Sequence, residues 1–391
     1  MLPLATSTWD ENEYEALQKV IDSGMFSMGP KVKEFEEAFA AYIGSKYAVM
    51  VNSGSSANLA GVAALRYHSK YKLLPGDEVI VPAVSWSTTY YPLYQYGLKL
   101  KFVDIDAKTL NLDLKQLRSS IGPNTKAIFA VNLLGNPLNY EEIKQIIDDK
   151  SILLFEDNCE SLGASLGDKK AGNFGVFGTH STYFSHHIST MEGGVVTTND
   201  EELYHILLSL RSHGWTRHLP VENKLCKKSD NPFEESFRFI LPGYNLRPLE
   251  MSGALGIEQL KKLPEIIDGR RKNAEKFVSM FSSIPGISIQ AEVGKSSWFG
   301  FAIVVEGGKS QRDKIVAKLT DLGIECRPIV AGNFAKNPVV EHFDFTTHGS
   351  LKNADHVDEC GFFIGNHHYD ISEQLEKISS ALNSLVSTQT D

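Results

Sequence analysis

The hydrophobic positions of this 391-residue chain alternate between two spacings. Apolar residues repeat at helical intervals over residues 11–22 and 31–42, which predicts two amphipathic helices near the N-terminus. Short apolar runs bounded by turn residues then predict buried strands at residues 47–51, 78–82, 100–103, 127–132 and 152–155. Strands that alternate with helices in this way are typical of an α/β fold with a mainly parallel sheet covered on both faces.

The pattern changes in the second half of the chain. It predicts helices at residues 200–214, 248–263 and 270–281, a strand at 298–305 and a helix at 311–322. We expect a large domain over residues 1–249, including the N-terminal segment, and a smaller α+β domain over residues 250–391. Sheets of this type bind ligands at the carboxyl ends of their strands, so functional residues are expected in the loops that follow the strands.

Composition narrows the class of protein. A formal net charge of −9 argues against non-specific binding to nucleic acid. The first residues do not form a secretory signal, and no apolar run is long enough to span a membrane, so we expect a cytoplasmic protein with no membrane partner. The four cysteines have no CxxC spacing, so they indicate free thiols and neither a zinc site nor an iron–sulfur cluster.

Three of the loops after predicted strands carry candidate binding residues. Small residues around Gly54 and Ser55 open a helix, where backbone amides and hydroxyls can hold a phosphate; an ordinary capped helix start would look similar. Trp86 lies in a polar loop and could stack on a flat aromatic ligand, or could be a core residue. Asp157 and Glu160 follow the fifth strand and could face a protonated ring nitrogen, or serve only as helix caps.

Two further segments carry groups suited to proton transfer or anion binding. His186 and His187 stand six and five residues before the Glu-Gly-Gly motif at residues 192–194. Imidazole can exchange protons near neutral pH, and no carboxylate or cysteine lies at metal-ligand spacing from this pair. Asn245 and Arg247 lie in a turn-rich segment that enters a helix, which could equally be a plain linker between domains.

In this order, the motifs resemble those of the DegT/DnrJ/EryC1-like sugar aminotransferases, a family of pyridoxal-phosphate enzymes of fold type I. The likeness runs along almost the whole chain. The segments that carry it include Ser7-Thr8-Trp9-Asp10, Lys46-Tyr47-Ala48-Val49-Met50, Pro82-Ala83-Val84-Ser85-Trp86, Glu156-Asp157-Asn158-Cys159-Glu160, Ser185-His186-His187, His213-Gly214-Trp215-Thr216-Arg217, Arg247-Pro248-Leu249-Glu250 and Ser297-Trp298-Phe299-Gly300-Phe301.

The resemblance implies that the cofactor-binding lysine of the family is missing. The aminotransferases carry this lysine where the chain has His186, and the only lysines between Asp157 and Glu192 are Lys169 and Lys170, in a polar turn well before that position. Imidazole can shuttle protons but cannot form an imine with the cofactor aldehyde. Pyridoxal 5′-phosphate or pyridoxamine 5′-phosphate would therefore bind non-covalently. By resemblance, the histidine marks the dehydratase branch of the family.

The resemblance also implies a fold like that of aspartate aminotransferase and specific roles for the candidate residues. His186 would be the catalytic residue. Gly54, Ser55 and Ser181 would bind the cofactor phosphate, and Trp86 would stack on the ring. Asp157 would face the pyridine nitrogen, and Glu160 would lie near the ring substituents.

A homodimer is part of the implied active site. Asn245 would reach the cofactor phosphate of the neighbouring subunit, so each active site would be shared between two chains. Arg217, Arg247 and Arg327 are candidates for binding either the pyrophosphate of a nucleotide-linked substrate or a dicarboxylate amino donor.

The implied reaction removes the C3 hydroxyl from a nucleotide-linked 4-keto-6-deoxyhexose, with a GDP-linked, mannose-derived sugar as the expected substrate, in deoxysugar or O-antigen biosynthesis. His186 would take a proton and return it to the leaving hydroxyl, since an unperturbed imidazole titrates near pH ~6.5. Glutamate would restore the amine form of the cofactor and leave as 2-oxoglutarate. Two alternatives stay open: a sugar aminotransferase of the same family, and a catalytically silent binding or regulatory protein of the same fold.

Overall fold

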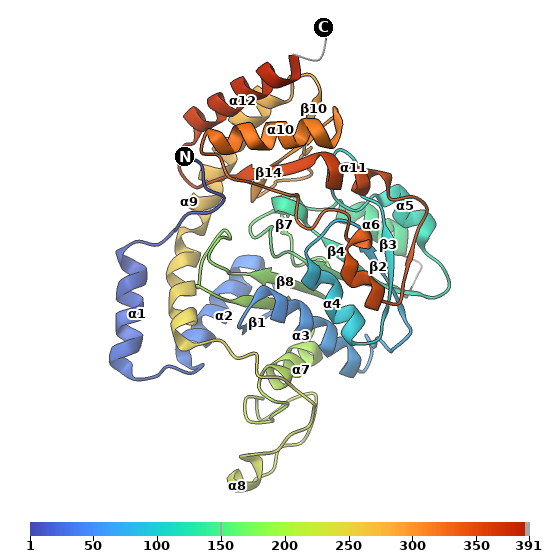
Figure 1. Ribbon diagram of the computed structural model, residues 1–391. Helices are drawn as coiled ribbons and strands as arrows, with labels where there is room; N and C mark the ends of the chain where they lie inside the picture. The colour runs from blue at the N-terminus through green and yellow to red at the C-terminus, as the bar shows by residue number, and fades with distance from the viewer. Residues whose placement is uncertain (149–150, 388–391) are drawn as a thin grey trace.

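The computed structural model describes residues 1–148 and 151–387, and its central feature is a sheet of eight strands (Figure 1). In spatial order these are β1 (Tyr47–Val51), β9 (Gly194–Thr198), β8 (Phe177–Ser181), β5 (Leu153–Asp157), β4 (Thr125–Val131), β2 (Glu78–Pro82), β3 (Lys99–Val103) and β13 (Phe345–Thr347). The strands from β8 to β13 run parallel, whereas β9 is antiparallel to both β8 and β1. The predicted α/β fold with a mainly parallel sheet is confirmed.

Helices cover both faces of this sheet. Successive residues of a strand point to opposite sides, so apolar residues at every position give the sheet two apolar faces. In β2, Val79 and Val81 pack into the core on one face, whereas Ile80 between them packs into the core on the other. The first face is covered by α3 (Gly54–Tyr67), α4 (Ser87–Gln95) and α7 (Glu201–Arg211). The second is covered by α5 (Leu114–Ser120), α6 (Tyr140–Ile147) and, at the β1 end, α2 (Pro30–Ile43). Burial on both faces explains why the strands read as continuous apolar runs.

A smaller antiparallel sheet forms the upper part of the molecule in Figure 1. Its strands, in spatial order, are β10 (Ile287–Ile289), β11 (Gly300–Val305), β14 (Gly361–Gly365) and β12 (Cys326–Arg327). Helices α10 (Gly308–Asp321) and α12 (Ser372–Ser387) share a core with this sheet, and α11 (Lys352–Cys360) precedes β14. Leu2 pairs with Ile324 in this unit, while β13 returns to the large sheet. The division at residue 250 stays a prediction.

One long helix replaces two predicted ones. The expected helices at residues 248–263 and 270–281 form a single helix, α9 (Glu250–Phe281), that contains Pro264 and runs alongside both sheets (Figure 1). A proline inside a helix removes one hydrogen bond and disfavours the helix by about 3 kcal/mol. Packing on both sides of the proline outweighs this effect, because Leu263 and Ile267 lie in the core of the large sheet and Phe277 lies in the core of the small one.

The remaining boundaries differ from the predictions by a few residues. The strand expected from residue 298 begins at Gly300, because Trp298 has φ +47°, a left-handed conformation that a strand does not allow. The other elements are α1 (Glu11–Ser23), η1 (Leu133–Gly135), β6 (Ser165–Leu166), β7 (Lys169–Lys170), α8 (Pro232–Glu235), η2 (Phe334–Lys336) and η3 (Pro338–His342). Within residues 1–148 and 151–387, none of the helices combines the length and apolar character needed to cross a membrane.

Candidate active site

A cavity of about 570 Å³ lies at the carboxyl ends of the parallel strands. It is bounded by the end of β4, the end of β5, the N-termini of α3 and α4, and the connection between β8 and β9. The residues that line it are Ser53, Gly54, Ser55, Asn58, Ser85, Trp86, Thr88, Val131, Asn132, Asp157, Cys159, Glu160, Ser181, Tyr183, Ser185, His186 and Glu192. Seven of the predicted site residues, from four separate loops, therefore meet in one place: Gly54, Ser55, Trp86, Asp157, Glu160, Ser181 and His186.

The N-terminus of α3 forms one wall of the cavity and is suited to a phosphate. Ser53 caps the helix by accepting a hydrogen bond from the Ser56 amide (3.0 Å), which leaves the cavity-facing start of α3 to Gly54 and Ser55. A Cβ on Gly54 would lie 2.7 Å from Cβ of Ser181, so only glycine fits this close approach. The positive end of a helix, with two serine hydroxyls beside it, could hold an anion here.

Trp86 and Asp157 lie on different walls of the same cavity. The Trp86 side chain is 57% exposed, so the alternative of a core tryptophan is wrong. The Asp157 carboxylate is held by three donors: the Asn58 amide nitrogen and the Thr89 hydroxyl, each 2.8 Å from Oδ2, and the Cys159 backbone amide, 3.1 Å from Oδ1. The arrangement could place a flat ring between an indole and a fixed carboxylate.

The carboxylates at the end of β5 and in the loop that follows it have different environments. Glu156 is completely buried and accepts hydrogen bonds from the backbone amides of residues 172, 174 and 175, so it is a structural residue. Glu160 lines the cavity and accepts a hydrogen bond from the Leu134 amide (3.0 Å). Burial raises the pKa of Glu160 to about 7, because the charged carboxylate is disfavoured away from water. Glu160 can therefore exchange a proton near neutral pH.

The two adjacent histidines point to different surroundings. His186 is half-buried and lines the cavity, where its ring lies 5.0 Å from the ring of Phe299. His187 is fully buried, and its Nε2 donates to the Ser297 carbonyl (3.0 Å) outside the cavity. Among the described residues that line the cavity, His186 is the only histidine and there is no lysine.

Burial lowers the pKa of His186 to about 4, and the positive charge of Arg270 adds to the effect. We expected a value close to that of free imidazole, so the surroundings hold His186 neutral more firmly than the sequence suggested. A neutral imidazole is ready to accept a proton. Once protonated, the same imidazolium is a stronger acid than a free one and gives its proton up readily.

Lys169 and Lys170 are not substitutes for the missing lysine. They form β7, which pairs with β6 in a hairpin away from the cavity. The Lys170 ammonium lies over the ring of Tyr42, 4.6 Å from its centroid, and that of Lys169 lies 5.2 Å from the ring centroid of Phe174.

The sequence matches the DegT/DnrJ/EryC1/StrS aminotransferase family over residues 7–383. The chain belongs to this family. A family member from Yersinia pseudotuberculosis, GDP-4-keto-6-deoxy-D-mannose 3-dehydratase, is 60% identical over 97% of this chain and 98% of its own. Among solved structures, E. coli GDP-4-keto-6-deoxy-D-mannose-3-dehydratase with bound hydrated PLP is 56% identical, with a TM-score of 0.96 over 98% of this chain and 99% of that chain. A mutant GDP-4-keto-6-deoxymannose-3-dehydratase with bound GDP-perosamine is also 56% identical, with a TM-score of 0.96 over 98% of this chain and 100% of that chain.

The other predicted site residues lie outside the cavity of their own chain. Asn245 is exposed, and its Oδ1 accepts a hydrogen bond from Nε of Arg247 (3.0 Å). Arg217 is exposed, with its guanidinium 6.0 Å from the ring centroid of Trp215. Arg327 is exposed in the short strand β12 and donates to the carbonyl of the preceding residue. Within one chain, the structure does not bring these four residues to the cofactor-sized cavity.

Sequence reasoning missed two residues that orient Asp157. Asn58 lies four residues after Gly54, one turn into α3, and Thr89 lies in the first turn of α4. Both are buried polar residues on otherwise apolar helix faces, and this is the signal that could have identified them. Cys159, which also lines the cavity, is one of four free thiols, and no three histidine, cysteine or acidic side chains of the described residues form a metal-binding group.

Proposed function

We propose that the protein removes the C3 hydroxyl from GDP-4-keto-6-deoxy-D-mannose in a pyridoxamine-phosphate-dependent reaction of deoxysugar biosynthesis. The observation that carries this proposal is His186 in the cavity, at the position where the resemblance puts the family's lysine. The 60% identity to the Yersinia pseudotuberculosis enzyme, over nearly the full length of both chains, supports the substrate and the reaction. A cytoplasmic location stays a prediction.

The residues that line the cavity fit pyridoxal 5′-phosphate. The N-terminus of α3, with Gly54, Ser55 and Ser181, would hold the phosphate. Gly194 lets the start of β9 pack closely against this loop, since a Cβ there would lie 2.2 Å from the Ser53 carbonyl oxygen. Trp86 would cover the ring. Asp157 would meet the ring nitrogen, and Glu160 would lie beside the ring substituents. Nδ1 of His186 is buried and has no hydrogen-bond partner among the described residues, so the imidazole is not committed to a structural contact through that nitrogen.

His186 performs the proton transfers in this proposal. When bound, the cofactor would supply an amine for the sugar C4 ketone. It would also supply an electron sink for the charge left when the C–H bond at its own C4′ carbon breaks. Neutral His186 accepts the proton released at that carbon and then donates it to the C3 hydroxyl, which leaves as water. The low pKa of His186 keeps the imidazole unprotonated before the first step and makes the imidazolium a strong donor in the second, while it weakens the imidazole as a base in the first.

The overall reaction is balanced with glutamate as the reductant. The sugar loses one oxygen atom and is reduced. Glutamate is oxidised to 2-oxoglutarate, and its nitrogen, after passing through the cofactor, is released as ammonia. Since a lysine is absent from the described cavity lining, the cofactor would be held there without a covalent bond to the protein.

The exposed candidates support a shared site in a homodimer. Asn245 lies beside the start of the phosphate loop, because the next residue, Leu246, accepts a hydrogen bond from the Asn52 amide (2.9 Å). Its side chain is nevertheless exposed and does not line the cavity of its own chain. By the family resemblance, we assign Asn245 to the cofactor phosphate of the partner subunit, and Arg217, Arg247 and Arg327 to the substrate pyrophosphate or the carboxylates of glutamate.

Sugar amination is the second candidate function, because the family is described as aminotransferases. In that reaction the catalytic lysine would carry a proton to the sugar C4, and the nitrogen would stay on the product. His186 in place of the lysine favours deoxygenation.

Product analysis by mass spectrometry tests the proposal. The protein would be incubated with pyridoxal phosphate, glutamate and a panel of nucleotide-linked 4-keto-6-deoxysugars that includes GDP-4-keto-6-deoxy-D-mannose. We expect a product of the GDP sugar that has lost one oxygen, together with 2-oxoglutarate. A product that has gained an amine would establish the aminotransferase instead, and no 2-oxoglutarate at all would indicate a silent binding protein.

A further inference from the structure

The loop that carries His186 connects β8 to β9 and is only partly held by the sheet. At its base, backbone hydrogen bonds join Thr182 to Gly193 (2.9 Å) and Thr190 to Thr182 (2.8 Å). Above them, the His186 amide donates to the Tyr183 carbonyl (2.9 Å), which is a contact inside the loop. The direction of the imidazole therefore depends on what holds the loop from outside.

Ser189, three residues after His186, is held on both sides by side chains from distant parts of the chain. Its backbone amide donates to Oε1 of Gln259 on α9 (2.9 Å). Its carbonyl accepts a hydrogen bond from Nε1 of Trp9, in the segment before α1 (3.1 Å). Both backbone groups of one loop residue are thus fixed by side chains that do not line the cavity.

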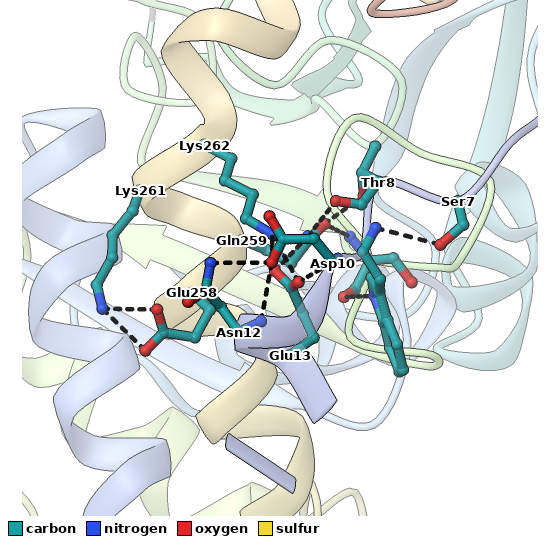
Figure 2. A network of polar contacts seen from close by, with 11 residues as sticks. Ser7, Thr8, Asp10, Asn12, Glu13, Glu258, Gln259, Lys261 and Lys262 are labelled. Atoms are coloured by element: carbon teal, nitrogen blue, oxygen red, sulfur yellow. Dashed lines mark hydrogen bonds and ion pairs between the residues drawn. The ribbon is translucent and has the colours of Figure 1, made fainter. Parts of the chain in front are cut away.

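Gln259 is completely buried and uses its whole amide group (Figure 2). Besides the Ser189 amide, Oε1 accepts from the Thr8 hydroxyl (2.5 Å), while Nε2 donates to the Thr8 carbonyl (3.1 Å) and to Oε1 of Glu13 (2.8 Å). A flipped amide would turn its NH₂ group toward the Ser189 N–H, so only one orientation satisfies all partners. The side chain of Gln259 is therefore a fixed anchor for the loop.

The anchor is itself held by an ion pair at the start of α1. The Glu13 side chain is fully buried; its Oε2 accepts from the Lys262 ammonium (2.6 Å) and from the Asp10 amide (2.7 Å). Figure 2 shows Lys262 and Gln259 reaching from α9 to the labelled residues of the N-terminal segment, Thr8, Asp10 and Glu13. The N-terminal segment, α9 and the His186 loop form one connected polar network.

We propose that Gln259 and Trp9 are positioning residues for His186: they fix the Ser189 backbone and thereby hold the imidazole in place for proton transfer. The inference rests on the proposed function of His186. Proton transfer needs donor and acceptor within hydrogen-bond reach, and a displacement of about 1 Å can slow an enzyme by about 100-fold. The segment before α1 is accordingly part of the catalytic apparatus, although it does not contact the cavity.

Trp9→Phe is the primary test, because it removes the N–H donor and keeps a ring against Tyr14, whose centroid lies 5.9 Å from that of Trp9. We expect turnover to fall by about 10-fold with KM for the sugar and affinity for pyridoxal phosphate unchanged. Lys261→Met is the matched control: Lys261 lies on α9 beside Lys262 but, among the described residues, bonds only to Glu258, so turnover should stay within twofold.

A double-mutant comparison shows whether Trp9 acts through His186. In a His186→Asn background, the Trp9→Phe change should lower the residual turnover by less than twofold, since there is no imidazole left to misplace. An equal loss in both backgrounds, a change confined to KM, or unchanged turnover of the single variant would each overturn the proposal.

Hydrogen exchange supplies a readout that does not depend on activity. In cofactor-free protein, Gln259→Leu should speed exchange of the amides at residues 185–191 by at least about 10-fold, while a peptide from β1 stays protected. Gln311→Leu, which alters another buried glutamine away from the cavity, controls for general loss of stability. Unchanged loop exchange in Gln259→Leu would refute the anchoring. If the protein dehydrates no sugar, the proposed function fails, but this measurement still decides whether Gln259 and Trp9 hold the loop.

Discussion

Replacing Glu160 by glutamine should reveal the raised pKa of this carboxyl as a pH-dependent difference in stability. Burial raises the pKa of Glu160 from its ordinary value of 4.5 to about 7 in the folded protein. Between these values the folded state binds more protons at this site than the unfolded state, so the free energy of unfolding falls as the pH rises. The favourable contribution is complete below about pH 4.5 and is lost above about pH 7.

The size of the effect follows from the same interval. From 4.5 to about 7, at about 1.36 kcal/mol per pH unit, the wild-type protein loses about 3 kcal/mol relative to a variant that does not titrate. About 2 kcal/mol of this loss falls between pH 5.5 and pH 8.5. Glu160→Gln is a close match for the protonated acid, since its amide oxygen can still accept from the Leu134 amide.

The assay is urea unfolding of both cofactor-free proteins at pH 5.5, 6.5, 7.5 and 8.5, at one protein concentration. Other titrating groups cancel when the two proteins are compared at each pH. From pH 5.5 to pH 8.5, we expect the free energy of unfolding of the glutamine variant to rise by about 2 kcal/mol relative to that of the wild type. A difference that stays constant with pH, or that favours the wild type as the pH rises, would show that Glu160 is not a buried carboxyl with a raised pKa.

Three further changes test the assigned site. His186→Lys should bind pyridoxal phosphate covalently, which a shifted visible absorption band would show, and should abolish deoxygenation. Undiminished deoxygenation would refute the role of the imidazole. Gly54→Ala should weaken pyridoxal phosphate binding by at least about 10-fold in a fluorescence titration, because its Cβ would lie 2.7 Å from Cβ of Ser181; Gly122→Ala, with no heavy atom within 4 Å, is the control, and equal affinities would exclude the phosphate cradle. Asn245→Asp and His186→Asn should each leave only a small residual turnover, and mixing the two variants should raise the activity well above that of either one if sites are shared, since one site of each mixed dimer is then intact; no recovery would count against the shared site.

The sheet could be predicted from the sequence because its strands are buried on both faces. Runs such as residues 79–82 contain no polar residue, and the loops that follow these strands are the ones that form the cavity. The glycine at the start of α3 was informative for a different reason. A Cβ on Gly54 would lie 2.7 Å from Cβ of Ser181, so only glycine fits there.

Other features could not be predicted because they depend on contacts between distant segments. The continuity of α9 through Pro264 rests on packing against two different cores, which no local pattern records. The left-handed backbone at Trp298, which delays β11, is likewise a tertiary feature, since Gly135 lies against it. The environments of His186 and His187 also depend on such contacts, and only the spacing from Glu192 favoured His186 over its neighbour.

The fate of the amino nitrogen tests the central claim most directly. The protein would be supplied with pyridoxal phosphate, GDP-4-keto-6-deoxy-D-mannose and glutamate labelled with ¹⁵N, and the sugar and the released ammonia would be analysed by mass spectrometry. If His186 directs deoxygenation, the sugar product has lost one oxygen, contains no label, and the ¹⁵N is recovered as ammonia. A sugar product that retains the ¹⁵N label and still has its C3 hydroxyl would contradict the account.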